Sequence, residues 1–377
     1  MPFMPFSIVL GWLTGLLSLV LIGGGLYLIW AWYVGAVTGT GYLVGGLLML
    51  LWTFAGRQIV LLFHPPGADE PKALRDGGVQ RVARPDGGEL QVELYGPPDA
   101  PPIVMTHGWG TNSTEWYYAK RQLADRFRLI VWDLPGLGES RQPDDNDYRP
   151  EKLARDLEAV LALAGNRPAI LLGHSIGGMI TLTFCRLFPQ ELARRVAGLV
   201  LVDTTYTNPV RTTTFSGFFR AVQKPLLEPL LHLSIWLSPI VWLMNWLSYL
   251  NGTAHITALL TGFAGQETRG QLDFATRFTP MASPAVLARG GLAALKYDET
   301  ATLGAIGVPV LVITGDLDRV TIPEANAHIN EAVPMGHLLK LRPGGHMALL
   351  EQNERFAEAV AEFGARCFER EQAQTTK

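Results

Sequence analysis

The first 56 residues of the chain contain no charged side chain, which restricts the environments in which they can fold. Within them, Ser7–Tyr33 is longer than the ~20 apolar residues that a helix needs to cross a bilayer. A second apolar stretch, roughly Val37–Ala55, begins within a segment of small residues. We therefore predict a hairpin of two transmembrane helices, forming an anchor over residues 1–62, in preference to one span followed by a re-entrant segment.

Aromatic and basic residues around these stretches indicate how the hairpin is oriented. Aromatic side chains gather within Tyr27–Tyr33, as is typical of a headgroup boundary. The loop between the stretches has no lysine or arginine, whereas Arg57, Lys72 and Arg75 follow the second stretch. The positive-inside tendency then predicts a multi-pass protein of the inner or plasma membrane whose downstream residues are cytoplasmic. A secretory signal peptide does not fit, because the apolar run is too long and lacks a basic start.

Downstream of a linker at residues 63–80, short apolar strands alternate with helices. Amphipathic helices are expected at about Pro150–Ala164 and Asn353–Arg370. This alternation predicts an α/β fold with a mostly parallel sheet covered on both faces, in two parts at residues 81–205 and 290–377. The expected strands are Leu90–Gly96, Pro101–Gly108, Arg128–Gly136, Ala169–Gly173, Val196–Asp203, Val308–Asp316 and a last one within His337–His346.

Residues 206–289 interrupt the alternation and are expected to form an apolar helical cap. Its centre, Pro225–Leu250, has Glu228 as its only formal charge, and its prolines divide it into short helices. A third membrane span is therefore not expected. Two interpretations remain compatible: a cap packed on the core, or a lid that meets lipid or lines an apolar pocket.

The segment Gly173-His174-Ser175-Ile176-Gly177 has the pattern G-x-S-x-G between an apolar strand and a helix of small residues. A serine on such a tight turn presents its hydroxyl outward, and the flanking glycines keep side chains out of the crowded corner. The start of the following helix directs N–H groups and a positive dipole end to the place where an oxyanion would form. Ser175 is therefore the candidate nucleophile.

A serine nucleophile needs a base and a group that orients the base. Asp316 and Asp318 follow one predicted strand, and His346 follows the last strand. Because parallel strands end at one edge of a sheet, these residues are expected to converge on the serine. The backbone N–H groups of Trp109 and Ile176 are the candidate oxyanion donors.

Five segments in this order resemble the α/β-hydrolase superfamily, specifically its capped serine esterase and lipase-like branch, which includes monoacylglycerol-lipase-like proteins. The resemblance covers about Leu90–Phe368 and implies Ser175 as nucleophile, Asp318 as acid and His346 as base. Relatives with a membrane anchor and a large apolar cap are often esterases of this kind. The matching segments are His107–Trp109, Asp133–Ser140, Gly173–Gly178, Gly315–Asp318 and Gly344–His346.

Some assignments stay open at this point. Asp316 remains an alternative acid, and so does Asp203, because some relatives place the acid after that earlier strand. His107 and His174 are expected to shape the oxyanion loop and the serine turn rather than to react. Cys185 and Cys367 are expected to be reduced thiols in or near the core.

These residues predict a membrane-anchored serine hydrolase that cleaves lipophilic or lipid esters through an acyl-enzyme. An acyltransferase, a C–C bond hydrolase with the same triad and a non-catalytic ligand-binding protein are the alternatives. No metal or organic cofactor is required by this chemistry. The expected partners are a lipophilic ester substrate and membrane lipid, with no obligate protein partner evident. The net charge of −3 and the absence of a basic cluster disfavour nucleic acid.

Overall fold

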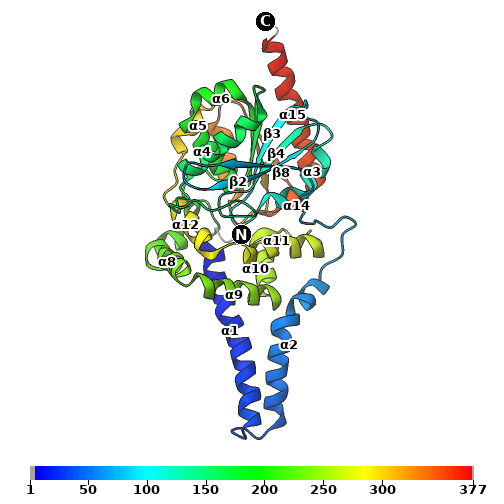
Figure 1. Ribbon diagram of the computed structural model, residues 1–377, viewed down its shortest axis with the longest axis vertical. Helices are drawn as coiled ribbons and strands as arrows, with labels where there is room; N and C mark the ends of the chain where they lie inside the picture. Colours follow the sequence, from blue (N-terminus) through cyan, green and yellow to red (C-terminus); the bar gives the residue numbers. More distant parts are fainter. Residues whose placement is uncertain (1–4, 376–377) are drawn as a thin grey trace.

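The computed structural model describes residues 5–375 and has three parts stacked along its long axis (Figure 1). An α/β core lies at one end, a layer of helices lies beneath it, and a helical hairpin extends away at the other end. The predicted α/β fold is confirmed, and the following paragraphs keep only what positions the functional site.

The core is built on one eight-stranded sheet with the order β1-β2-β4-β3-β5-β6-β7-β8. The pairs β1·β2 and β2·β4 are antiparallel, and every other pair is parallel. The predicted mostly parallel sheet is therefore confirmed. The strands are β1 (Gly78–Ala83), β2 (Glu89–Tyr95), β3 (Pro102–Thr106), β4 (Arg128–Trp132), β5 (Ala169–His174), β6 (Val196–Val202), β7 (Val310–Gly315) and β8 (Gly336–Leu341).

Alternate residues of the buried strands enter two separate apolar clusters, one on each face of the sheet. On β3, Val104 belongs to one cluster, whereas Ile103 and Met105 belong to the other. The first cluster is covered by α4, α5 and α13, and the second by α3 and α15. Figure 1 shows α4 and α5 on one side of the sheet and α3 and α15 on the other. Helices of the core are α3 (Tyr117–Leu123), α4 (Pro150–Leu161), α5 (Ile176–Leu187), α6 (Pro189–Arg195), α13 (Pro323–Ala332), α14 (Ala348–Glu351) and α15 (Asn353–Thr375), with 3₁₀ turns η1 (Ser113–Trp116), η2 (Ala162–Ala164) and η5 (Thr300–Ala305).

Helices α1 (Pro5–Tyr33) and α2 (Thr40–Leu62) pack against each other as an antiparallel hairpin (Figure 1). Both helices are long and apolar enough to cross a membrane. They approach closely at Gly25 and Gly46, where a Cβ on Gly46 would lie 2.8 Å from the Gly25 carbonyl oxygen. Such small-residue contacts are typical of helix pairs in membranes.

The helical layer is the insertion between β6 and β7, and we call it the cap. Several large apolar side chains of the cap are exposed, among them Trp236, Trp242 and Leu243. Two of its segments, Ser216–Trp236 and Ser238–Leu250, are together apolar enough to form one membrane span, but they meet at a bend of 101°. The cap comprises η3 (Pro209–Arg211), α7 (Ser216–Val222), the π-helical turn η4 (Gln223–Leu227), α8 (Glu228–Trp236), α9 (Ser238–Leu250), α10 (Thr253–Gly262), α11 (Arg269–Met281) and α12 (Pro284–Ala294).

The hairpin is attached to the cap by buried polar contacts. On α1, Ser18 lies 3.1 Å from Ser248 Oγ and accepts a hydrogen bond of 2.7 Å from Asn251 Nδ2. Nearer the start of α1, the Trp12 indole N–H donates to Ser234 Oγ at 3.1 Å. Since Ser234 is on α8 and Ser248 on α9, these contacts join α1 to two cap helices.

Helix α2 joins the cap through its one charged residue, Arg57, which lies 2.8 Å from Asp273 on α11. Tyr249 and His255 also donate to the Asp273 carboxylate, each at 3.0 Å. We call Arg57, Tyr249, His255 and Asp273 the anchor–cap cluster. The second apolar stretch was expected to end near Ala55, and α2 continues past it because the cap provides a partner for the arginine.

Candidate active site

Ser175 lies at the corner between β5 and α5 and has a strained backbone, with φ 54° and ψ −117°. A non-glycine residue in such a sparsely populated region costs about 1–3 kcal/mol, which the surrounding structure must offset. Gly173 and Gly177 make the corner possible. A Cβ on Gly173 would lie 2.3 Å from the Gly177 backbone, and one on Gly177 would lie 2.2 Å from the Thr106 carbonyl oxygen.

His346 lies in the segment between β8 and α14, and its Nδ1–H donates to Asp318 Oδ2 at 2.8 Å. The Asp318 carboxylate also accepts the backbone N–H of Val320 at 2.6 Å, and the hydroxyl of Thr321 at 2.8 Å. These bonds hold the carboxylate in one orientation. Burial lowers the pKa of His346 below its ordinary value, although the negative charge of Asp318 opposes this effect.

The other two carboxylates considered in the sequence do not contact His346. Asp316 accepts the backbone N–H of Gly344 at 3.1 Å. Asp203 is fully buried and accepts the backbone N–H of Gly315 at 2.8 Å. Burial and the nearby charge of Asp318 raise the pKa of Asp203 well above its ordinary value. Of the three, only Asp318 is placed to orient the imidazole.

Ser175 and His346 line one small cavity of about 20 Å³, together with Trp109. Among residues 5–375, the Ser175 hydroxyl makes no hydrogen bond with the His346 ring. Catalytic hydrogen bonds are often long in the ligand-free state and shorten when substrate binds, so the absence of this bond is compatible with a catalytic pair.

The two candidate oxyanion donors are placed differently. Ile176 is the first residue of α5, where backbone N–H groups have no carbonyl partner within the helix. Trp109 lies in the loop after β3, and its indole N–H donates to the Leu287 carbonyl of α12 at 3.1 Å. Trp109 therefore lines the cavity and also ties the core to the cap.

A buried pair of Glu115 with His174, which lines the cavity, was not expected from the sequence. Glu115 Oε1 accepts from His174 Nδ1 at 3.0 Å and from the Gly108 backbone N–H at 3.2 Å. The other ring nitrogen of His174 lies 3.1 Å from the His346 carbonyl oxygen. Burial opposes ionisation of Glu115, but His174 holds the pKa of Glu115 below its ordinary value. Through this pair the loop after β3, the serine corner and the His346 segment are linked.

The His107 ring is also held by contacts with neighbouring backbone groups. Its Nε2 accepts the Leu134 backbone N–H at 2.9 Å, and its Nδ1 lies 2.7 Å from the Gly108 carbonyl oxygen. Within the residues that the structure describes, no group of three or more His, Cys, Asp or Glu side chains is arranged to hold a metal ion.

The amino-acid sequence is similar to those of known esterases and hydrolases. The chain is 29% identical over 269 residues to a pimeloyl-[acyl-carrier protein] methyl ester esterase of Hamiltonella defensa, covering 71% of this chain and 93% of that protein. It is 25% identical over 282 residues to the uncharacterized hydrolase YugF of Bacillus subtilis, covering 74% of this chain and 95% of that protein.

Solved structures share the fold. An esterase of Thermogutta terrifontis superposes with a TM-score of 0.60 at 23% identity, over 77% of this chain and 99% of that chain. A membrane phospholipase A described as a bacterial virulence factor gives a TM-score of 0.61 at 21% identity, over 77% and 86%. Residues 103–359 match the Alpha/beta hydrolase family. The chain is therefore a member of the alpha/beta hydrolase family.

Proposed function

We propose that the protein is a membrane-anchored serine hydrolase that cleaves carboxylic esters of lipophilic or lipid substrates through an acyl-enzyme on Ser175. In the first step Ser175 Oγ attacks the ester carbonyl while His346 Nε2 takes the hydroxyl proton. The imidazolium, held by Asp318, then gives this proton to the departing alcohol oxygen. In the second step His346 activates water, which attacks the acyl-enzyme and releases the acid.

The observation that carries this proposal is the placement of three groups on separate loops of one sheet edge. Ser175 has the strained geometry of a nucleophile corner, and His346, with Asp318 on its far nitrogen, lines the same cavity. A serine that merely forms a turn would gain nothing from this strain. Lowering of the His346 pKa by burial also suits a base that must be neutral at the start of each cycle.

Backbone N–H groups of Trp109 and Ile176 are proposed to stabilise the oxyanion. Donors of this kind contribute strongly because they are fixed before charge develops, and removal of one typically costs about 100- to 1000-fold in rate. The contacts of Glu115 with Gly108 and His174 support the loop that carries the first donor.

A lipophilic substrate is supported by the hairpin and by the cap. Both hairpin helices are long and apolar enough to cross a membrane, and exposed cap side chains such as Trp236 and Trp242 continue this apolar surface. The pimeloyl ester relative acts, by its name, on the methyl ester of a carrier-bound acyl group. With Lys72 and Arg75 following the second span and Arg57 near its end, we propose a cytoplasmic catalytic domain.

The test is hydrolysis of p-nitrophenyl esters with acyl chains of two to sixteen carbons by the detergent-solubilised full chain. We expect activity to rise with chain length and to be lost in Ser175→Ala. Ser140→Ala would serve as a matched serine control, since Ser140 bonds to backbone groups at Asp133 and Gln91 rather than lining the cavity. Equal activity on acetyl and decanoyl esters would contradict the lipophilic substrate.

The alternatives give different products. An acyltransferase would form new esters when acceptor alcohols are added, at the expense of free acid. A C–C bond hydrolase would leave simple esters nearly untouched while cleaving β-diketone-type compounds. A binding protein would retain ligands without forming an acyl-enzyme.

A further inference from the structure

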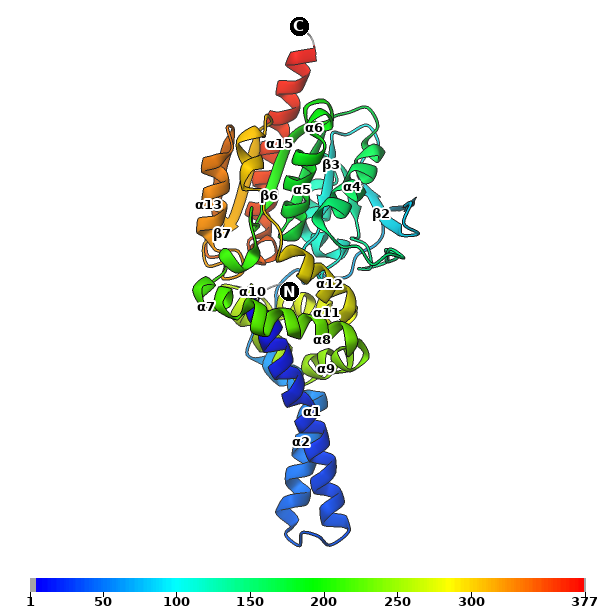
Figure 2. The same ribbon diagram turned by 90° about the vertical axis from the view of Figure 1, so that its left-hand side faces the viewer.

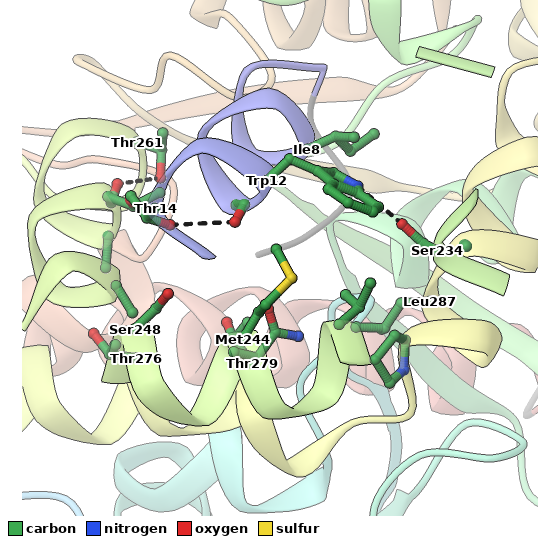
Figure 3. Close-up of a pocket in the computed structure, with 18 of the residues that line it drawn as sticks. Ile8, Trp12, Thr14, Ser234, Met244, Ser248, Thr261, Thr276, Thr279 and Leu287 are labelled. Carbon is green, nitrogen blue, oxygen red and sulfur yellow. Dashed lines mark hydrogen bonds between the residues drawn. The ribbon is translucent and has the colours of Figure 1, made fainter. Parts of the chain in front are cut away.

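A second and larger cavity, of about 120 Å³, lies between the start of α1 and the cap (Figure 3). Four residues of the membrane hairpin line it, namely Ile8, Gly11, Trp12 and Thr14. The remaining wall comes from the cap helices α8 to α12, with Met244 and Leu287 among its apolar side chains. We call this space the α1–cap cavity.

The hydroxyl groups around the α1–cap cavity are largely occupied. Thr14, Ser234 and Thr276 each donate to a backbone carbonyl three or four residues earlier in their own helix, and Thr257 and Thr261 do the same on α10. With their hydrogen-bonding capacity used in this way, these side chains present mainly methyl and methylene groups. The cavity therefore suits an apolar guest better than a charged one.

The α1–cap cavity and the Ser175 cavity are neighbours, linked by residues that line adjacent cavities. A third cavity, lined by Phe215 and Arg319, has Val320 in common with the Ser175 cavity and Thr261 in common with the α1–cap cavity. On another side, Trp109 of the Ser175 cavity donates to the carbonyl of Leu287, which lines the α1–cap cavity. On this side, Trp109 and Leu287 are in direct contact and lie between the two cavities.

The length of the hairpin places this cavity at the membrane surface. From Ser18, which bonds to the cap, α1 has only about 23 Å left to its end at Tyr33, given a rise of ~1.5 Å per residue. The hydrocarbon core of a bilayer is about 30 Å thick. A hairpin that crosses it must therefore draw the lower part of the cap into the lipid, where Trp236 and Leu243 are exposed.

We propose that α1 is part of the substrate site, and that the α1–cap cavity receives the far end of the hydrocarbon chain of the ester cleaved at Ser175. This inference rests on the proposed function and assigns a second task to the membrane helix. A cavity of ~150 Å³ lined by apolar side chains holds benzene, so the α1–cap cavity takes a segment of about five or six carbons. Acyl chains too short to reach the α1–cap cavity gain no affinity from it.

Gly11 provides a way to fill the cavity without disturbing its walls. A Cβ on Gly11 meets no atom within 4 Å, so Gly11→Leu places a side chain into open space. Gly23 offers the matched control on the same helix: it also has nothing within 4 Å, and it lies outside the cavity. Gly23→Leu thus changes the helix by the same substitution while leaving the cavity open.

The experiment compares wild type, Gly11→Leu and Gly23→Leu on p-nitrophenyl esters of four to sixteen carbons. Moving one methylene from water into an apolar site is worth about fourfold in affinity. Exclusion of three methylenes is therefore expected to lower kcat/KM for dodecanoyl and longer esters by about 50-fold in Gly11→Leu, with butyrate unaffected. Gly23→Leu should follow wild type at every length. An unchanged chain-length profile in Gly11→Leu would overturn the proposal.

A second readout does not depend on activity. Dodecanoic acid with a terminal diazirine is photolysed with the solubilised full chain, and the labelled residues are identified by mass spectrometry. Met244 and Thr276 line the cavity and are only 2% and 3% exposed, so a probe in surrounding detergent does not reach them. We expect both to be labelled in wild type and spared in Gly11→Leu.

The two readouts distinguish failure of the proposed function from failure of the proposed hydrocarbon site. Labelling of Met244 in a protein that hydrolyses no ester would retain the hydrocarbon site and reject the proposed function. Ester hydrolysis lost in Ser175→Ala, together with absent labelling and an unchanged profile in Gly11→Leu, would retain the function and reject this inference.

Discussion

At the scale of single residues, the proposed chemistry depends on Asp318 holding His346. The 2.8 Å bond to Nδ1 fixes the ring orientation and leaves Nε2 as the proton acceptor. Asp318→Asn removes the negative charge and permits the wrong tautomer. We expect kcat/KM for ester hydrolysis to fall by about 10⁴-fold, as in serine proteases with the equivalent change.

Asp316→Asn is the matched control for this prediction. Asp316 bonds to the Gly344 backbone and does not contact His346, so its variant should retain activity within a few-fold of wild type. Circular dichroism and thermal unfolding would verify that both variants are folded. A larger loss in Asp316→Asn than in Asp318→Asn would transfer the role of the acid to Asp316.

The protonation of His346 predicts the pH dependence of the reaction. Burial lowers the pKa of His346 below the ordinary value of about 6.5, although Asp318 opposes this. Protonated imidazole cannot accept the Ser175 proton, so activity should be present above this pKa and lost as the pH falls through it. A profile of kcat/KM should therefore show an acid limb with its midpoint below ~6.5. A midpoint well above 7 would contradict this environment for His346.

Local sequence context was sufficient to nominate Ser175, His346 and the pair Asp316 and Asp318, because each follows an apolar strand, and the family resemblance implied Asp318 as the acid. It was insufficient for Glu115, which lies in a polar segment without a distinguishing pattern. The role of Glu115 depends on contacts with His174, 59 positions away, and such contacts exist only after the sheet has formed. The choice among Asp203, Asp316 and Asp318 likewise required the distances.

At the scale of secondary-structure elements, the anchor–cap cluster joins α2 to α9, α10 and α11. Burial opposes ionisation of Asp273, but its hydrogen bond with His255 and the charge of Arg57 hold the pKa of Asp273 below its ordinary value. This contribution to stability is present above the unfolded-state pKa of about 3.9 and is lost as the pH falls through the lower folded-state value.

Asp273→Ala should loosen the hairpin from the cap. The change leaves Arg57, Tyr249 and His255 without their shared acceptor, and loss of such partly buried bonds costs about 1–3 kcal/mol. We expect a Tm several degrees lower in detergent and faster proteolysis at the linker after α2. Glu331→Gln on α13 is the control, since Glu331 is exposed and far from the cluster. An unchanged Tm in Asp273→Ala would show that the other contacts, such as those of Trp12 and Ser18, hold the hairpin without this cluster.

Elements with strong apolar patterns were predictable, and those whose partners are distant were not. The strands β3 to β7 are buried runs and were expected close to their observed positions. Strand β1 (Gly78–Ala83) was assigned partly to the linker, because this mostly exposed edge strand has no apolar alternation. Periodicity also did not show that α1 lines a cavity, since a lipid-facing helix and a cap-facing helix have similar composition.

At the scale of the whole molecule, the tip of the hairpin and the α/β core lie at opposite ends of the long axis (Figure 2). If the hairpin crosses the bilayer, these ends lie on opposite sides. Both native cysteines, Cys185 and Cys367, are buried, so maleimide labelling reports on a single introduced cysteine without background from them. Thr38 in the tip and Asp99 in the core are both exposed positions.

We expect a membrane-impermeant maleimide to label Thr38→Cys in intact cells, and to label Asp99→Cys only after the membrane is opened. This pattern follows from Arg57 near the end of α2 and from Lys72 and Arg75 after it. The reverse pattern would invert the orientation. Labelling of both positions from one side would mean that the hairpin enters the bilayer without crossing it.

The bonds between hairpin and cap also decide which part of the molecule can move. A lid on a soluble enzyme can move over a stationary body, but here both helices of the hairpin are bonded to the cap, through Ser18 and Arg57. The α/β core joins the hairpin and cap through the chain segments 63–77, 203–208 and 295–299 and through packing contacts such as that of Trp109. If the hairpin crosses the bilayer, we therefore expect the site to open by a tilt of the core relative to the hairpin and cap, rather than by movement of the cap over a stationary core.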